Sequence, residues 1–479
     1  MPYILIYDVG TSSLKLMLYD KNGEVIFVNS YPYEYATPKV GWAEINPQKW
    51  EQALWKGLDE IAAKFALSEL VAIAGTGQMH TVILLDEQQE VLEPCILWLD
   101  RRADQETVEL QEMFSLPPYV LNSTYSLPKL FWLNKNMPEV VAKTKKILWA
   151  KDYIRFLLNG VISTDATEGL GAGLLNWETS SWEKTRLMKI GWNEDVLPQI
   201  LPADAGVGKL KNEIAEKYSI NKQVKILTSS GDILALLGGA PHKKGRLVYS
   251  LGTSSMFFTL VEKIMVSKCG GLYTLALAGL HLFGGVSSTT GAALTWCKEK
   301  LWGEISWDEM LSAAWKVEAG KEGLIFIPYL AGERSPYWSD QIAGGFYGLT
   351  LEHDKRHLTR AVLEGVAFSV KHMLDLYKDN GVDINEIALA GGGVKTKGWG
   401  QLIADVCGVN VVIFTGQETV GNAVFAISKS SIGKEKFNDI LAGMFNLGVT
   451  LIPNDDRGKE LLAAYQNFRK FSQFAIEIT

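Results

Sequence analysis

The fold is decided near the start of the chain by the stretch Tyr3-Ile-Leu-Ile-Tyr-Asp8-Val-Gly10-Thr-Ser-Ser13-Leu-Lys-Leu16. The run before Asp8 is apolar, which predicts a buried strand, and apolar residues resume after Ser13, so a hairpin is expected. Small residues in such a turn let backbone N–H groups approach phosphate oxygens. A carboxylate beside phosphates is tolerable mainly when a divalent cation lies between them. Asp8 is therefore a candidate Mg²⁺ ligand, and the alternative is an ordinary hairpin with Asp8 in its turn.

A second copy of this pattern begins at Leu247. The apolar run 247–251 is followed by the same four residues, Gly-Thr-Ser-Ser, and then by another apolar run that starts at Met256. A repeated unit indicates two related domains, which are expected to close on one polyphosphate from opposite sides. The length of 479 residues also suits two domains. The short polar link 241–245 places the boundary, giving domains 1–242 and 243–479.

Composition and charge exclude several classes of protein. A hydrophobic content of 47% and a charged content of 21% describe a well-cored globular chain. The net charge of −7, with no Lys/Arg cluster to offset it, argues against a nucleic-acid partner. No apolar run reaches about 18 residues, so no membrane partner is expected. The four cysteines form no CxxC motif, which fits a cytoplasmic protein without disulfides or a zinc site.

Polar residues crowd the ends of predicted strands in the first half of the chain. The strand 71–74 runs into Gly77-Gln78-Met79-His80, the kind of position where open α/β sheets bind ligands. Trp98 and Asp100 combine a stacking face with hydrogen-bonding groups, as a sugar site needs. The alternative for Asp100 is an ion pair with Arg101 or Arg102. The strand 224–227 leads to Asp232, whose alternative role is to cap a helix.

In the second half, Gly291 opens a predicted helix, and the triple glycine 391–393 ends the predicted strand 387–390. Three glycines after a buried strand indicate that something bulky lies against the backbone, either a nucleotide base or a neighbouring helix. The glycine-rich stretches 169–173 and 206–210 match neither a Rossmann nor a Walker motif.

Together these stretches resemble the FGGY carbohydrate kinases over essentially the whole chain, and within that family the xylulokinases. Each stretch is weak alone, but their order and spacing are specific. The matching stretches are Asp8–Ser13, Gly77–His80, Trp98–Arg102, Lys151–Ile154, Gly231–Asp232, Gly252–Ser254, Gly332–Trp338, Arg360–Gly365 and Ala390–Gly393.

The resemblance implies an α/β fold of two actin-like ATPase (RNase H-like) domains with a catalytic cleft between them, the first binding sugar and the second ATP. It implies that Asp232 is the general base and that Asp8 is the Mg²⁺-phosphate residue. The implied sugar contacts are Gln78, Met79, His80, Trp98, Asp100 and Asp232. The implied ATP contacts are Gly10, Thr11, Ser12, Ser13, Gly252, Thr253, Ser254, Gly291, Gly391, Gly392 and Gly393.

The implied function is ATP-dependent phosphorylation of the terminal hydroxyl of a ketopentose, with D-xylulose as the expected substrate. Another linear sugar or polyol, such as ribulose or gluconate, is the first alternative. An actin-like nucleotide-driven binding protein without sugar chemistry is the second. Thr81, Leu99 and Ile233 depart from the residues usual in xylulokinases, so the sugar is the open question. Because dimers are common in this family, the resemblance also implies a homodimer.

Overall fold

The computed structural model describes residues 2–116, 120–176, 179–234, 240–269, 271–277, 280–320, 323–339, 341–415 and 419–477. The chain forms two compact units. Unit 1 consists of Met1–Gly238 and Glu418–Met444, and unit 2 consists of Gly239–Gln417 and Phe445–Thr479. The α/β class and the division into two domains are thus confirmed, while the boundary at residues 242 and 243 stays a prediction. None of the described helices combines the length and apolarity that crossing a membrane requires.

Unit 1 is built on a five-stranded sheet in the order β13-β5-β1-β2-β3. The predicted hairpin is confirmed: β1 runs antiparallel to β2, with Val9 opposite Leu14 at its closed end. β5 lies parallel to β1 on the other side, so the ends of β1 and β5 meet at one edge. The strands are β1 (Tyr3–Val9), β2 (Ser13–Tyr19), β3 (Val25–Pro32), β5 (Leu70–Gly77) and β13 (Lys225–Ile226).

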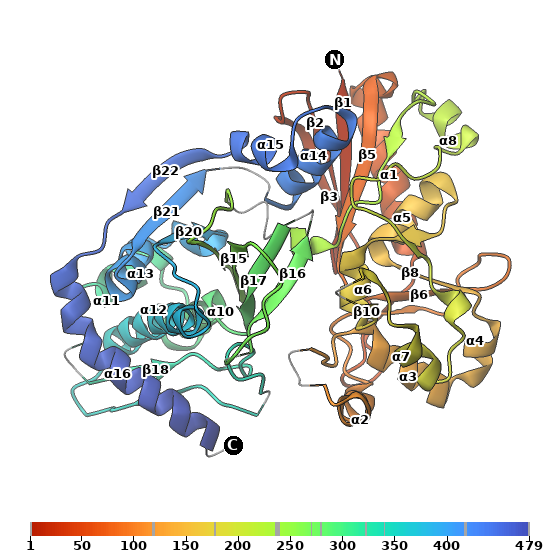
Figure 1. Ribbon diagram of the computed structural model, residues 1–479. Coiled ribbons are helices and arrows are strands. Elements are labelled where there is room, and N and C mark those ends of the chain that lie inside the picture. Colours follow the sequence, from red (N-terminus) through yellow and green to blue (C-terminus); the bar gives the residue numbers. More distant parts are fainter. Residues whose placement is uncertain are drawn as a thin grey trace. The chain divides into compact units, whose positions relative to one another are not determined.

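Helices from distant parts of the sequence cover this sheet. α1 (Gln48–Lys64) buries Trp50, Leu54, Leu58 and Ile61, the apolar stripe that its sequence spacing predicts. α14 (Thr419–Ile432) packs on β1 and β5, although it comes from near the end of the chain, and it lies beside the red strands in Figure 1. Its Gly421 permits this approach, because a Cβ there would lie 2.3 Å from the Tyr19 hydroxyl.

A second, four-stranded sheet of unit 1 has the order β4-β7-β6-β8. Leu84, Ile147 and Trp149 of this sheet bury their side chains in a separate hydrophobic core. The remaining elements of unit 1 are β4 (Glu44–Ile45), β6 (Val82–Leu85), β7 (Cys95–Ile96), α2 (Asp104–Phe114), α3 (Ser126–Asn136), α4 (Pro138–Lys143), β8 (Lys146–Trp149), α5 (Ala150–Asn159), β9 (Ser163–Thr164), α6 (Ala166–Ala172), β10 (Leu175–Asn176), β11 (Ser181–Trp182), α7 (Lys184–Lys189), β12 (Gln199–Ile200), α8 (Asn212–Lys217) and α15 (Phe437–Gly443).

Unit 2 repeats the central topology of unit 1 in a seven-stranded sheet, ordered β16-β17-β15-β14-β20-β21-β22. The hairpin β14–β15 corresponds to β1–β2, and β20 lies parallel to β14 as β5 does to β1. The duplication seen in the Gly-Thr-Ser-Ser turns therefore extends to the sheets. Its strands are β14 (Arg246–Leu251), β15 (Ser255–Val261), β16 (Tyr273–Leu277), β17 (Leu280–Ser287), β20 (Glu386–Ala390), β21 (Asn410–Thr415) and β22 (Asn446–Leu451), and β18 (Ile325–Ile327) pairs with β19 (Gly345–Tyr347) in a separate two-stranded sheet.

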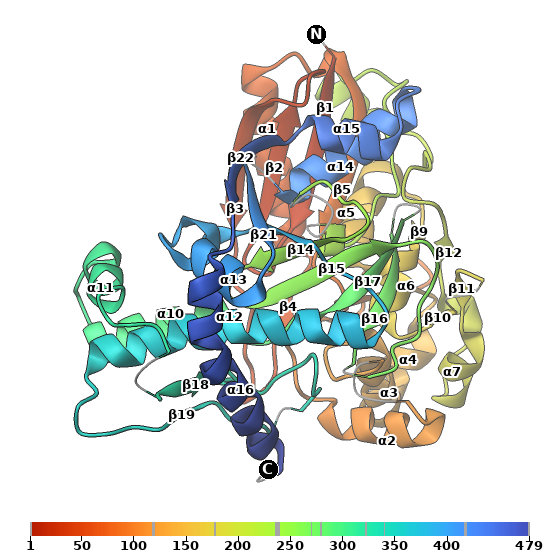
Figure 2. The same cartoon turned by 60° about the vertical axis from the view of Figure 1, so that its left-hand side comes forward.

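The long helix α12 (Lys355–Asp379) crosses the sheet of unit 2, as Figure 2 shows. It begins at Asp354, whose carboxylate accepts hydrogen bonds in a capping box. Its inward face, including Val362, Val366 and Phe368, belongs to the core of this unit. The other α-helices in the described part of unit 2 are α10 (Gly291–Cys297), α11 (Trp307–Ala314), α13 (Trp399–Cys407) and α16 (Asp455–Glu477).

Candidate functional site

The first glycine-hydroxyl turn is held rigidly at the edge of the unit 1 sheet. The Gly10 carbonyl accepts hydrogen bonds from the Tyr33 hydroxyl at 2.6 Å and from Gln78 Nε2 at 3.2 Å. The Gly10 amide donates to the Ser13 carbonyl at 2.9 Å. Asp8 lies half-buried at the end of β1, two residues before this turn. Gln78 is buried, so its side chain braces the turn, a role that the sequence did not indicate.

Trp98 joins the predicted sugar segment to this turn, because its indole Nε1 donates to Thr11 Oγ1 at 3.0 Å. The rest of the side chain stays accessible, with 39% of the residue exposed, so it keeps a face on which a ligand can pack. One direct hydrogen bond thus connects Thr11 of the turn with Trp98, a predicted sugar contact.

Asp100 adopts the alternative foreseen for it. It is fully buried, and its two carboxylate oxygens accept from Arg102 Nε at 2.9 Å and Arg102 Nη2 at 2.8 Å. The Ala43 amide donates to the same carboxylate. Arg102 also lies over the Trp42 ring, with its guanidinium carbon 3.6 Å from the ring centroid. The Asp100 carboxylate therefore links Arg102 to the backbone just before β4, and this geometry does not favour a direct contact with a sugar.

His80 is held in a backbone conformation that few side chains adopt. Its φ is 69°, in the left-handed region, and its ring Nδ1 lies 2.7 Å from the Gly171 carbonyl oxygen. Burial lowers the pKa of His80 to about 4, so the ring is neutral at pH 7. Because a carbonyl only accepts, the proton is on Nδ1 and the lone pair is on Nε2. Nε2 is then the ring atom that can accept a hydrogen bond from a hydroxyl group.

Met79 packs against Gly231, the residue before the predicted base, and against Gly171 of α6. A Cβ on Gly231 would lie 2.5 Å from Met79 Cγ, and a Cβ on Gly171 would lie 2.9 Å from Met79 Cε. Only glycine therefore lets α6 and the segment before Asp232 approach the end of β5 so closely. The structure brings together Met79, His80 and the segment that carries Asp232.

Asp232 begins a short 3-10 helix, Asp232–Leu234, at the end of that segment. Solvent reaches the residue, yet the surrounding protein desolvates its carboxyl group and raises its pKa to about 7. The charge of Asp8 is the second cause of the increase, and the amides of Asp232 and Ile233 partly offset it. A carboxyl group with such a pKa can exchange a proton near neutral pH.

Asp8 and Asp232 form a pair of carboxylates close enough to repel each other. Within the described ranges, no group of three or more His, Cys, Asp and Glu side chains is arranged to hold a metal ion by itself. Mg²⁺ usually keeps several waters and binds one or two carboxylates together with phosphate oxygens. The residues at this position therefore fit a Mg²⁺ ion that arrives with a polyphosphate.

In unit 2 the second glycine-hydroxyl turn is bonded to the start of α10. The Gly291 amide donates to the Gly252 carbonyl at 2.8 Å, and the Thr290 amide donates to the Thr253 carbonyl at 3.0 Å. A Cβ on Gly291 would lie 2.5 Å from the Gly252 oxygen. The turn residues Thr253 and Ser254 are accessible. The turn at Gly252 and the start of α10 at Gly291, both predicted to contact ATP, are thus joined by backbone hydrogen bonds.

The triple glycine has two different environments. A Cβ on Gly393 would lie 2.5 Å from Leu251 Cγ, and Gly391, with φ of 87°, lies against the Leu251 carbonyl. Both glycines therefore permit close packing on β14. A Cβ on Gly392 would meet nothing within 4 Å. Packing against neighbouring residues therefore does not require a glycine at Gly392, unlike at Gly391 and Gly393.

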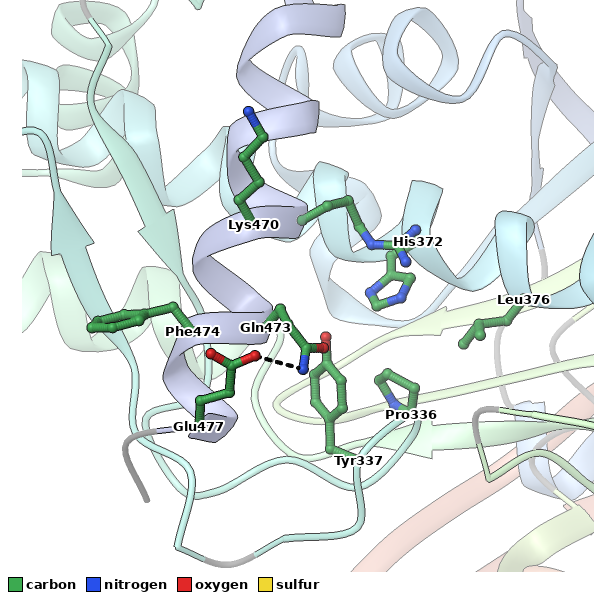
Figure 3. A pocket seen from close by; sticks show the side chains of 9 residues that line it. Pro336, Tyr337, His372, Leu376, Lys470, Gln473, Phe474 and Glu477 are labelled. Atoms are coloured by element: carbon green, nitrogen blue, oxygen red, sulfur yellow. Dashed lines mark hydrogen bonds between the residues drawn. The ribbon is translucent and has the colours of Figure 1, made fainter.

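A hollow of about 680 Å³ lies elsewhere in unit 2, between α16, α12 and the loop at Pro336 and Tyr337. Figure 3 shows His372 from α12 facing the Tyr337 ring across it. None of the site residues predicted from the sequence lines this hollow. Because no predicted site residue lines this hollow, it is not the candidate site.

Comparison with known proteins identifies the same family as the sequence motifs. The FGGY family of carbohydrate kinases matches with its N-terminal domain at residues 3–238 and its C-terminal domain at residues 247–429. A xylulose kinase of Lactococcus lactis subsp. lactis is 32% identical over 90% of this chain and 88% of its own. A gluconokinase of Bacillus subtilis is 28% identical over 96% of this chain and 93% of its own. A Brucella ovis protein described as a xyloylose kinase has a crystal structure that matches with a TM-score of 0.92 and 26% identity over 99% of both chains.

Proposed function

The chain belongs to the FGGY family of carbohydrate kinases and is a sugar kinase, and we propose that it phosphorylates the terminal hydroxyl of D-xylulose to give D-xylulose 5-phosphate. The observation that carries this proposal is the packing of Met79 against Gly231, the residue before Asp232, with His80 next to Met79 and bonded to the Gly171 carbonyl. An apolar side chain, a neutral hydrogen-bond acceptor and a carboxyl group with a pKa near 7 form a wall suited to a linear polyhydroxy chain.

In the proposed reaction the sugar hydroxyl oxygen attacks the γ-phosphorus of ATP. The new bond forms as the bond from that phosphorus to the β–γ bridging oxygen breaks, and ADP leaves. Asp232 accepts the hydroxyl proton, which contributes about 10²–10⁴ in rate. His80 Nε2 accepts a hydrogen bond from another hydroxyl, and Met79 packs on the carbon chain. Most of the acceleration comes from alignment and charge stabilisation.

We propose that Asp8 is the carboxylate that holds Mg²⁺ beside the phosphates. When bound, the ion neutralises charge on the β- and γ-phosphate oxygens. Thr11, Ser12 and Ser13 in unit 1 would then donate backbone or hydroxyl hydrogens to phosphate oxygens, and Gly10, whose amide is bonded to the Ser13 carbonyl, would let the phosphate approach the backbone. Gly252, Thr253 and Ser254 have the equivalent role in unit 2, since their turn has the same sequence and the same position in its sheet.

The adenosine is proposed to lie against Gly391, Gly392 and Gly393, with Gly291 beside the phosphates. The support is the open space at Gly392 and the bonded surface that Gly291 makes with Gly252. Two further expectations of the sequence stay proposals here, a cytoplasmic location and a homodimer. All four cysteines are free thiols, which suits a reducing compartment.

The test is the release of ADP by the purified protein with Mg²⁺-ATP and a panel of linear substrates. The panel contains D-xylulose, ribulose, gluconate and a simple polyol. We expect kcat/KM to be highest for D-xylulose. A higher value for gluconate would support the second candidate, which the similarity to a gluconokinase favours, and would refute D-xylulose. ADP release that is independent of sugar would instead support the actin-like binding protein.

A further inference from the structure

The backbone segment that leads to Asp232 is held at both ends by buried side chains. At its start, Arg155 Nη1 donates to the Thr228 carbonyl at 3.1 Å. At its end, the Gly231 amide donates to Thr167 Oγ1 at 2.8 Å. Arg155 comes from α5 and Thr167 from α6, both labelled in Figure 1. Gly231 directly precedes Asp232, so the second hydrogen bond acts next to the proposed base.

One continuous polar network connects these two anchors. Thr167 Oγ1 donates to Asp165 Oδ2 at 2.7 Å, and Asp165 Oδ1 lies 3.0 Å from Lys151 Nζ. Lys151 Nζ also donates to Asp152 Oδ1 at 2.7 Å, and Arg155 Nη1 donates to the same oxygen at 2.8 Å. An unbroken series of hydrogen bonds and ion pairs between protein side chains therefore connects the Gly231 amide with the Thr228 carbonyl.

The hydroxyl of Thr167 has only one orientation in this network. It has a single proton, which it gives to Asp165, so its lone pairs face the Gly231 N–H. The Asp165 carboxylate also accepts from the Thr167 amide at 2.9 Å, which fixes the start of α6. The hydrogen bond at Gly231 is thus oriented by a charged group that does not contact the segment itself.

The network lies in the interior, where its charges are costly unless they are paired. Lys151, Asp152 and Arg155 are at most 1% exposed, and Asp165 is 2% exposed. Two cations face two carboxylates, and burial raises the pKa of the neighbouring Glu168 well above the ordinary value. A balanced buried network of this kind adds little stability but specifies one geometry.

The segment itself needs such restraint. Ser229 has a φ of 57°, which is uncommon for a residue other than glycine, and its buried hydroxyl has no hydrogen-bond partner. Gly231 touches Met79 so closely that a shift of the segment would also disturb the predicted sugar wall. Strain at a buried position persists only when the surrounding contacts hold it.

We propose that Thr167 is a positioning residue that sets the direction of the Asp232 carboxyl group through the Gly231 amide. The inference rests on the proposed function, in which Asp232 accepts the proton of the sugar hydroxyl. Thr167 itself touches neither sugar nor nucleotide in this proposal. A misplacement of about 1 Å at a reacting group can cost a hundredfold in rate, so loss of this hydrogen bond has a measurable consequence.

The test compares Thr167→Val and Thr167→Ala, which lack the hydroxyl, with Thr167→Ser, which keeps it. We expect kcat for the best sugar of the panel to fall about tenfold to a hundredfold in Val and Ala variants, with KM changed less than threefold. The Ser variant should restore most of the lost kcat. If Thr167→Val does not fold, Thr167→Ala decides, because a smaller side chain cannot overpack the site.

Thr107→Val is the matched control. Thr107 is a buried threonine of the same unit whose hydroxyl donates to the Ala103 carbonyl at 2.8 Å, with no link to the segment before Asp232. It should lose stability like Thr167→Val but keep the wild-type kcat. An unchanged kcat in Thr167→Ala, or an equal loss in Thr107→Val, would overturn the positioning role.

A double-mutant cycle with Asp232→Asn separates this inference from the function on which it rests. If Thr167 acts through Asp232, then Thr167→Ala causes no further loss of kcat in the Asp232→Asn background. Full independent losses would refute the coupling. Failure of the proposed function is recognised differently, because the wild-type protein would then release no ADP in response to any sugar.

Discussion

The pH dependence of the reaction is the sharpest consequence of the site geometry. Asp232 has an ordinary pKa of 3.8, which desolvation and the charge of Asp8 raise to about 7. Only the deprotonated carboxylate can accept the hydroxyl proton. At pH 8 about ten in eleven molecules are in this form, and at pH 6 about one in eleven. We therefore expect kcat/KM for the sugar to fall about tenfold from pH 8 to pH 6.

The assay is ADP release at saturating Mg²⁺-ATP, measured in quenched samples so that no coupling enzyme adds its own pH dependence. Asp232→Asn is the control, since it keeps the shape of the side chain and cannot accept a proton. Its activity should be about 10²–10⁴ lower and should not change between pH 6 and pH 8. A wild-type kcat/KM that is constant over this range would refute the assignment of the base, as would an unaltered pH profile in Asp232→Asn.

The raised pKa of Asp232 also predicts how the stability of the fold depends on pH, with the opposite sign from most carboxyl groups. Because the folded state raises the pKa of Asp232, the folded state binds this proton more tightly than the unfolded state. The stabilisation of the folded state by this proton is fully present below pH 3.8 and is lost as the pH rises through about 7. Asp232→Asn should therefore increase Tm at pH 8 and leave it nearly unchanged at pH 3.5. Thermal unfolding of both proteins at the two pH values measures this difference.

Four other variants test separate parts of the site. Asp8→Asn should move the acid limb of kcat/KM to lower pH and raise the Mg²⁺ concentration needed for turnover, and a pH profile at several Mg²⁺ concentrations would contradict this if neither changed. His80→Asn keeps a donor for Gly171 and tolerates positive φ but removes the Nε2 acceptor, so sugar kcat/KM should fall about tenfold while Tm stays the same. Gly392→Ala should raise KM for ATP several-fold without changing Tm, whereas Gly393→Ala should lower Tm because its Cβ meets Leu251; equal melting of the two variants would contradict the packing argument.

The sequence predicted the elements whose signal is local. The hairpins at Gly10 and Gly252 follow from apolar runs on both sides of a turn, and β5 follows from its own apolar run. The return of α14 to unit 1 could not be predicted, because the periodicity of a helix identifies its buried face but not its partner. That partner is set by a close approach at Gly421, which only coordinates reveal.

The site residues divide in the same way. Asp8, His80 and Asp232 stand at strand ends or turns, where position in the sequence already suggests function. The choice between an ion pair and a sugar contact for Asp100 needed distances, since both interpretations use the same residues. Thr167 left no signal in the sequence, because a threonine after an aspartate at a helix start is ordinary capping chemistry.

Thr81 differs from the residue usual in xylulokinases, and its contacts show which part of the site this difference touches. Thr81 is fully buried, and its hydroxyl donates to Gln78 Oε1 at 3.4 Å, while Gln78 Nε2 donates to the Gly10 carbonyl. The Thr81 side chain is therefore linked through Gln78 to the turn at Gly10, which we propose to bind phosphate. Since Gln78 and His80 are two residues apart at the end of β5, one strand end fixes both the turn and the sugar wall. A change at Thr81 should accordingly affect ATP and sugar together, whereas a change at His80 should affect the sugar alone.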